Sequence, residues 1–260
     1  ITSVYDDKFD ISAKLRLVIQ VSAAMLVAYS GVRIESMFGL FGIYAIPVEL
    51  QYVLTVVVLV GSTNAFNLID GVDGLAGTMG LVTSLLLAFI GLSLGLNGIF
   101  MLCLGIAAGL IAFLKHNLYP AKIFMGDAGS MTLGFLFTFL SIILLQKSAH
   151  SANSILIFVL ISCALMVPVI DALRVFMKRF AKGNSILTAD KTHLHHLILD
   201  GKRNHKKVVL RIVVLQLTLL FVGVFLSTII SITGIILSLV FAQIVFSKIL
   251  LINKSLAEWQ

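Results

Sequence analysis

The chain has few charged residues and few cysteines. Charged side chains make up 12% of its 260 residues and hydrophobic ones 59%, whereas soluble domains carry roughly 25% charged residues. This composition excludes an ordinary soluble domain. The two cysteines, Cys103 and Cys163, lie within apolar runs, where a small polarizable side chain is ordinary packing. We assign them no redox or metal-binding role.

The chain also lacks internal repeats, low-complexity tracts and a visible signal peptide. Its first residues, "ITSVYDDKFD", have no initiator methionine and read as the end of a further helix. We therefore expect N-terminal spans to be missing from this sequence.

What the sequence does contain is a series of long apolar segments. Each has close to the ~20 residues that a helix needs to cross a bilayer core, and none shows the alternation of a barrel strand. The predicted fold is all-α, a polytopic transmembrane protein with one integral-membrane domain over residues 1–260. About eight spans are visible, near residues 16–34, 46–62, 78–95, 98–114, 130–146, 153–173, 208–228 and 231–250.

The basic residues are distributed unevenly between the two sides of these spans. If each segment crosses the membrane once, successive loops alternate between the two sides. Seventeen of the nineteen lysines and arginines then lie on one side, and only Arg33 and Lys147 lie on the other. By the positive-inside rule, the richer side is cytoplasmic. The net charge of +7 therefore reflects topology, and we expect no nucleic-acid partner. Residues 174–207 are predicted to form a basic, histidine-containing cytoplasmic loop, whereas the loops on the opposite side are short and plain.

Polar clusters gather on the predicted cytoplasmic face. "YDDKFD" places Asp6 and Asp7 where a helix meets the membrane surface, although a solvated helix end would have the same pattern. "NLIDGVDG" spaces Asp70 and Asp73 three residues apart, so one helical turn would bring both carboxylates to one face. A capped, glycine-rich loop is the alternative for that segment.

Two further clusters follow. "FMGDAGS" sets Asp127 between glycines ahead of an apolar helix. An aspartate there could cap the helix, but the glycines also permit close approach of a ligand, and a carboxylate suits Mg²⁺. "KTHLHHL" contributes His193, His195 and His196. Histidines at this spacing can bind zinc or be merely exposed, and without a cysteine partner or HExxH spacing a structural zinc site is not indicated.

Together the clusters are more informative than any one of them. A carboxylate at the centre of a membrane helix costs roughly 2.5–3.5 kcal/mol, so five aspartates on one face require a functional reason. Several aspartates with few thiols indicate a hard divalent cation, and such a cation beside basic residues suggests phosphate or diphosphate chemistry. At a membrane surface this means a lipid phosphate that meets a soluble, phosphorylated substrate.

Two other classes of protein fit less well. A cation-coupled transporter also places aspartates within spans, but it should carry them mid-span and in repeated halves. A non-catalytic membrane scaffold has no reason to gather aspartate, histidine and arginine on one face.

Four motifs, in this order along the chain, resemble those of the polyprenyl-phosphate N-acetylhexosamine-1-phosphate transferases (glycosyltransferase family 4): "DDKFDISAKLRLVIQ", "TNAFNLIDGVDGLAG", "HNLYPAKIFMGDAGS" and "DKTHLHHL". The resemblance covers essentially the whole chain. It implies transfer of an N-acetylhexosamine 1-phosphate from a UDP-N-acetylhexosamine to undecaprenyl phosphate, with release of UMP and a requirement for Mg²⁺ or Mn²⁺. It also implies a multi-pass protein of the bacterial inner membrane whose active site faces the cytoplasm. A homodimer is compatible with this family, and no motif dictates an interface.

The "HLHH" and "DDxFD" patterns resemble the undecaprenyl-phosphate GlcNAc-1-phosphate transferases, which start cell-envelope polysaccharide assembly. The phospho-MurNAc-pentapeptide translocases of the same family usually carry three consecutive histidines. They are the alternative assignment for this chain within the family. Family members also have further spans ahead of "DD", which this sequence lacks.

The resemblance carries roles over to individual residues. Asp127 would bind the metal, and Asp6 and Asp7 would lie at the reaction centre. The three histidines and Arg179 would contact phosphate groups or sugar. Direct attack by the lipid phosphate and a two-step route through an aspartyl phosphate both remain open. The nucleotide side of the pocket would be formed by Asn64, Asn67, Asp70, Asp73, Asn117 and Phe124.

Overall fold

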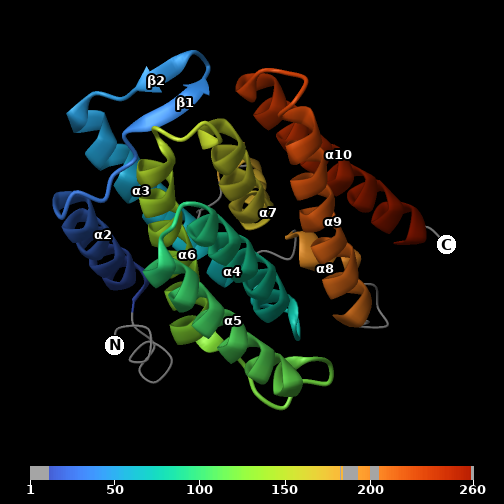
Figure 1. Ribbon diagram of the computed structural model, residues 1–260. Helices are drawn as coiled ribbons and strands as arrows, with labels where there is room; N and C mark the ends of the chain where they lie inside the picture. The colour runs from blue at the N-terminus through green and yellow to red at the C-terminus, as the bar shows by residue number, and fades with distance from the viewer. Residues whose placement is uncertain (1–11, 182, 184–192, 200–204, 259–260) are drawn as a thin grey trace.

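The computed structural model describes residues 12–181, 183, 193–199 and 205–258, apart from the side chains of Ala13 and 254–258. Within these residues the chain is a bundle of long helices with one small hairpin (Figure 1). The elements are α2 Ala13–Tyr29, β1 Ser36–Leu40, β2 Ile43–Ala45, α3 Val48–Leu68, α4 Leu75–Ser93, α5 Asn97–Asn117, α6 Gly126–Ser148, α7 Ser154–Ala181, α8 Leu194–Ile198, α9 His205–Leu226 and α10 Ile232–Glu258.

The helices confirm the predicted multi-pass membrane fold. Among the described residues, seven helices are long and apolar enough to cross a membrane. The eighth predicted span is α2, whose 17 residues lie at the short end of the range for a span. Each predicted apolar segment therefore contains a helix. The helix α2 ends at Tyr29, before the predicted end of the span 16–34, whereas α3 and α7 extend beyond their predicted ends, to Leu68 and Ala181. Because α7 ends at Ala181 and α9 begins at His205, the predicted loop 174–207 includes the ends of two helices.

Neighbouring helices approach closely where one of them carries a small residue. A Cβ added at Gly134 of α6 would lie 3.0 Å from the Thr63 Cα of α3 and 2.9 Å from the Phe66 Cβ. The absence of a side chain lets the two backbones pack directly, as is common between membrane helices. This contact matters for the site because it aligns the end of α3 with the first turn of α6.

A proline within α7 is compensated by a side chain of α9. Pro168 has no N–H, so the carbonyl of Ala164 loses its intrahelical donor. Gln216 Nε2 donates to that carbonyl at 3.2 Å, and the Gln216 side chain is fully buried. A carbonyl without a partner would be costly in lipid, so this bond secures α9 against α7 where the helix is interrupted.

A β-hairpin between α2 and α3 was not predicted, because residues 31–49 read as a plain loop. Its strands pair antiparallel, with Leu40 opposite Ile43. The two residues between them, Phe41 and Gly42, both have positive φ, as the tight turns of two-residue hairpins require. Phe38 packs against Phe158 of α7, with ring centroids 5.2 Å apart. The "FGLFG" repeat of aromatic residues and glycines was the available signal.

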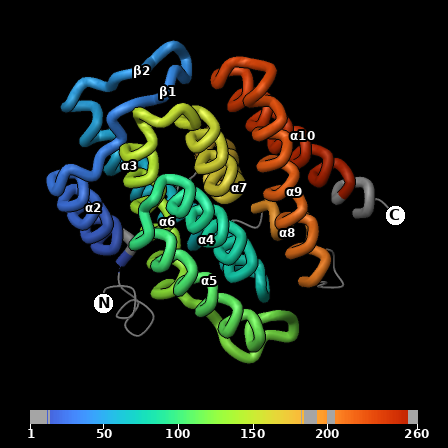
Figure 2. Tube along the Cα trace, in the orientation of Figure 1, coloured from blue at the N-terminus to red at the C-terminus, as the bar shows by residue number. Residues whose placement is uncertain are grey.

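The hairpin and the predicted functional residues lie at opposite ends of the bundle. The hairpin lies at one end, and the loop between α5 and α6 lies at the opposite end (Figure 1). The tube view shows α2 and α10 on opposite flanks, with α3, α4, α6 and α7 between them (Figure 2). The functional residues predicted from sequence gather at the end away from the hairpin.

Candidate active site

A cavity of about 820 Å³ opens at the end of the bundle away from the hairpin. Its walls come from the start of α2, the end of α3, the turn that follows α3, the start of α6, the end of α7 and the segment around α8. Segments far apart in the sequence thus meet in one place. The polar and charged lining residues are Lys14, Arg16, Gln20, Asn64, Asn67, Asp70, Asp127, Arg179, His193, His195 and His196.

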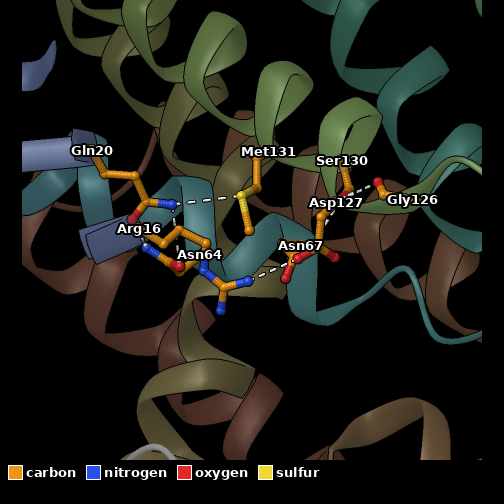
Figure 3. A network of polar contacts seen from close by, with 8 residues as sticks. All are labelled: Arg16, Gln20, Asn64, Asn67, Gly126, Asp127, Ser130 and Met131. Atoms are coloured by element: carbon orange, nitrogen blue, oxygen red, sulfur yellow. Dashed lines mark hydrogen bonds and ion pairs between the residues drawn. The ribbon is translucent and has the colours of Figure 1, made fainter. Parts of the chain in front are cut away.

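Asp127 is the centre of a polar network in this cavity (Figure 3). Its Oδ2 accepts from Arg16 Nη1 at 2.8 Å, and its Oδ1 accepts from Asn67 Nδ2 at 2.9 Å. The residue lies in the first turn of α6, where the helix dipole favours a negative charge. Asp127 is therefore held at the cavity wall between α2 and α3.

One turn deeper, amide side chains connect α2 to α3. Asn64 Nδ2 donates to Gln20 Oε1 at 2.7 Å (Figure 3). It also donates to the carbonyl of Val60 at 2.8 Å. Gln20 Nε2 also lies 3.6 Å from the sulfur of Met131. These bonds satisfy polar groups within the membrane helices and fix the position of Arg16 relative to Asp127.

Asp70 is held in an environment that opposes its charge. Burial, and then the nearby charge of Asp127, raises its pKa from 3.8 to about 7, and a hydrogen bond from the backbone of Gly126 offsets part of this rise. Since the folded-state pKa lies above the ordinary value, ionisation of Asp70 costs folding stability as the pH rises from about 4 to about 7. A positive ligand next to both carboxylates would remove this cost.

These residues fit a magnesium ion better than a structural zinc. In the described part of the chain, no three His, Cys, Asp or Glu side chains are grouped so that they could hold a metal. Mg²⁺ needs no such cage, because it commonly takes one or two carboxylates and completes its shell with water and substrate phosphates. Asp127 and Asp70 supply that number of carboxylates, and Asp127 is the ligand predicted from sequence.

The histidines form one wall of the cavity. His193 and His195 are almost fully buried, and the rings of His195 and His196 lie 4.2 Å apart. Burial, followed by the charges of His196 and His193, lowers the pKa of His195 to about 3. The imidazole of His195 is therefore uncharged near pH 7. Its Nδ1 is buried with no hydrogen-bond partner among the described residues, so the hydrogen-bonding capacity of this nitrogen is unused there.

Gly71 determines where His195 can lie. A Cβ added at Gly71 would be 2.9 Å from His195 Nε2, well inside normal contact. Because that atom is the end of a side chain, we expect Gly71→Ala to displace the imidazole while leaving the fold intact. In an active site, a displacement of about 1 Å can cost on the order of 100-fold in rate. We therefore expect turnover in the reaction proposed below to fall about 10- to 100-fold, as for His195→Ala.

The control for this substitution is Gly105→Ala on α5, where an added Cβ meets nothing within 4 Å. Turnover and the melting temperature of both variants would be measured in parallel. A Gly71→Ala protein with wild-type turnover would show that the position of His195 is unimportant.

Two predicted residues lie outside the cavity lining. Residues 69–74 form turns after α3, so Asp70 and Asp73 do not share a helical face, and that interpretation was wrong. Asp73 Oδ2 accepts from the Ala121 backbone at 3.0 Å, and the side chain of Asn117 accepts from Gly74 N at 2.9 Å. Both residues hold the turn in place, and a contact with nucleotide stays a prediction for them.

The remaining predicted residues are distributed as follows. Phe124 lines the cavity and is 76% exposed, and Arg179 lines it from the last turn of α7 while being buried. Asp6 and Asp7 lie outside the described residues. Sequence reasoning did not select Arg16 or Asp171, although an aspartate in the apolar run "VPVIDALRVF" was a usable signal for the second.

Comparison with known proteins points to one family. A family model described as glycosyl transferase family 4 matches residues 1–145. A probable undecaprenyl-phosphate N-acetylglucosaminyl 1-phosphate transferase of Bacillus subtilis is 34% identical over 218 residues, which are 81% of this chain and 58% of that protein. The undecaprenyl-phosphate alpha-N-acetylglucosaminyl 1-phosphate transferase of Salmonella typhimurium is 31% identical over 84% of this chain and 60% of its own length.

A decaprenyl-phosphate N-acetylglucosaminephosphotransferase of Mycobacterium tuberculosis is 30% identical over 79% of this chain and 55% of its own length. The chain thus spans between 55 and 60% of the length of these curated relatives.

Proposed function

Because the chain belongs to glycosyl transferase family 4, we propose that it transfers GlcNAc 1-phosphate from UDP-GlcNAc to undecaprenyl phosphate and releases UMP. The observation that carries this proposal is the cavity itself. It combines carboxylates suited to Mg²⁺ with buried or half-buried cationic and imidazole side chains at one end of a membrane bundle. The names of the relatives support the lipid phosphate and the N-acetylglucosamine group.

The side chains of the cavity can position and neutralise three anionic phosphates. Arginine recognises phosphate through paired N–H donors, and Arg16 and Arg179 enter the cavity from α2 and α7. Phe124, exposed beside the cavity, offers an apolar face on which a nucleobase can stack. The neutral ring of His195 can hydrogen-bond the sugar or a phosphate without adding charge.

The reaction is proposed to be a direct displacement. An oxygen of the lipid phosphate attacks the β-phosphorus of UDP-GlcNAc, a new P–O bond forms, and the bond to UMP breaks as UMP leaves with its electron pair. When bound, Mg²⁺ or Mn²⁺ neutralises phosphate charge and makes phosphorus more electrophilic. Arg16, Arg179 and the metal-binding Asp127 align the two phosphates, and such alignment supplies much of the rate in phosphoryl transfer.

A transfer assay tests this function. The purified protein in detergent would be supplied with radiolabelled UDP-GlcNAc, undecaprenyl phosphate and Mg²⁺. We expect a labelled lipid that releases labelled GlcNAc on mild acid hydrolysis, together with an equal amount of UMP. Release of UMP without labelled lipid, or no release at all, contradicts the proposal.

We propose that the protein spans the inner membrane of a bacterial cell and that its cavity opens on the cytoplasmic side. The support is the uneven distribution of lysine and arginine. When the predicted spans cross the membrane in order, seventeen of the nineteen basic residues lie on the same side as the cavity. In a background without Cys103 and Cys163, a cysteine at Lys122 should be protected from an impermeant thiol reagent in intact cells. A cysteine at Ala152 should be labelled.

Both positions are exposed in the structure, so burial does not account for the expected difference. Permeabilised cells provide the control, because both cysteines should then react. Labelling at Lys122 with protection at Ala152 in intact cells would reverse the proposed orientation.

A further inference from the structure

Asp171 is a buried carboxylate beside the cavity that the proposed reaction does not use. It lies in α7, three residues after Pro168, and its side chain is only 3% exposed. It does not line the cavity. A buried carboxylate is costly unless it is fully hydrogen-bonded, so its partners indicate why it is there.

Two of those partners come from the histidine segment. Asp171 Oδ2 lies 3.0 Å from His193 Nδ1, and both carboxylate oxygens lie 3.1 Å from the backbone nitrogen of Leu194. Arg174, one turn later in α7, donates to Oδ1 at 2.7 Å. The first two bonds connect the end of α7 to residues more than twenty positions later in the chain.

The contact with Leu194 explains how α8 begins. Leu194 is the first residue of α8, and its N-cap, His193, makes no capping hydrogen bond with its own side chain. A helix N-terminus has N–H groups without intrahelical partners. Asp171 satisfies one of them from a different helix, so α8 and its histidines are held at a defined place against α7.

The contact with His193 determines which ring nitrogen carries the proton. An ionised carboxylate can only accept hydrogen bonds, so Nδ1 must be the protonated nitrogen in the neutral ring. Nε2 is then the nitrogen left for a ligand, and His193 lines the cavity. The same logic operates wherever a carboxylate orients a catalytic or metal-binding histidine.

We propose that Asp171 is a positioning residue for the transfer reaction: it holds His193 as the Nδ1–H tautomer, with Nε2 presented to the substrate. This inference rests on the proposed function for its effect on turnover. Its structural part, the tautomer, does not depend on that function. The competing account is a purely structural role, in which Asp171 anchors α8 whatever His193 does.

Asp171→Asn separates the two accounts. Asparagine keeps the shape but has one acceptor oxygen in place of two, and its NH₂ group can only donate. With the NH₂ group towards His193, the ring loses its Nδ1–H bond or adopts the Nε2–H tautomer. With the oxygen towards His193, the NH₂ group faces the Arg174 donor, which disfavours that orientation. We expect kcat to fall about 10- to 100-fold, the range found when the group that orients a histidine is removed. The KM for UDP-GlcNAc should change by less than about twofold, because the lost interaction acts in the transition state.

A double-mutant cycle tests whether the effect runs through His193. In a His193→Ala background, adding Asp171→Asn should lower kcat by less than about twofold. A loss as large as in the wild-type background would show that Asp171 acts independently of His193 and would overturn the proposal. An unchanged kcat in the single variant would do the same.

The matched control is Gln243→Leu. Gln243 is fully buried and donates to the Val167 carbonyl of α7 at 2.9 Å, so its loss removes a buried bond to the same helix without reaching His193. This variant should have a lower melting temperature and a wild-type kcat. A comparable loss of kcat in Gln243→Leu would show that general disturbance of α7 accounts for the effect.

A spectroscopic measurement keeps the proposal testable if the transfer assay fails or Asp171→Asn does not fold. In protein labelled with ¹⁵N at histidine, the His193 signals are assigned by their loss in His193→Gln. The wild-type protein should show the Nδ1–H tautomer, and Asp171→Asn should shift it towards Nε2–H. An Nε2–H tautomer in the wild-type protein overturns the proposal, whereas absence of transfer with the expected tautomer contradicts only the proposed function.

Discussion

Asp127→Asn is expected to abolish transfer while leaving the protein folded. Asparagine keeps the size and one acceptor oxygen of the side chain, so bonds like those from Arg16 and Asn67 can still form. What it removes is the negative charge, and with it an anionic ligand for Mg²⁺. Charge stabilisation by a metal is worth several kcal/mol, so kcat should fall by at least about 1,000-fold.

Metal binding provides a second readout for the same variant. Mn²⁺ affinity, measured by electron paramagnetic resonance without substrates, should weaken strongly in Asp127→Asn. Glu35→Gln is the matched control, since it also converts a carboxylate to an amide, but next to the hairpin, where Glu35 accepts from Gln146. It should leave both transfer and Mn²⁺ binding unchanged. Near-normal turnover of Asp127→Asn in saturating Mg²⁺ would refute the metal assignment.

The electrostatics of Asp70 add a consequence of this substitution. The charge of Asp127 is the second cause of the raised pKa of Asp70, after burial. Removing that charge should lower the pKa of Asp70 but keep it above 3.8, because burial remains. A divalent cation bound next to both carboxylates would likewise lower the pKa of Asp70.

UDP-GlcNAc is expected to be a substrate, and UDP-MurNAc-pentapeptide is expected not to be one. The histidine wall is compact, because His193 and His195 are buried and His195 closely approaches Gly71. A site with buried polar groups can reject a mismatched substrate by about 10⁴- to 10⁵-fold, since the mismatch leaves those groups unpaired. A pentapeptide on the sugar would have to be accommodated next to this wall.

A side-by-side assay of the two donors decides this point. Equal concentrations of each would be supplied with undecaprenyl phosphate and Mg²⁺, and UMP release would be followed. We expect at least a 1,000-fold preference for UDP-GlcNAc or a closely related UDP-N-acetylhexosamine. Efficient use of the pentapeptide donor would place the protein with the translocases of its family, despite the "HLHH" pattern.

The membrane fold was accessible from the sequence because its causes are local. A bilayer requires about 20 apolar residues for each crossing and complete backbone hydrogen bonding within each segment, and both conditions can be read along a single stretch of chain. The positions of Asp127, Asn67 and His195 in one cavity also agree with their motifs. The hairpin was missed because it lies in a short segment whose turn depends on positive φ at Phe41, which its sequence does not favour.

What the tertiary structure decided is which polar groups face one another. Arg16 and Asp127 are 111 positions apart and form an ion pair, while Asp70 and Asp73 are neighbours that point to different partners. The role of Asp171 likewise depends on where His193 lies, 22 residues later. Sequence by itself determined the membrane-spanning segments and the chemical types in the site, and it predicted their sidedness. Packing determined the pairs, because burial and charge–charge interactions depend on distances that only the folded bundle sets.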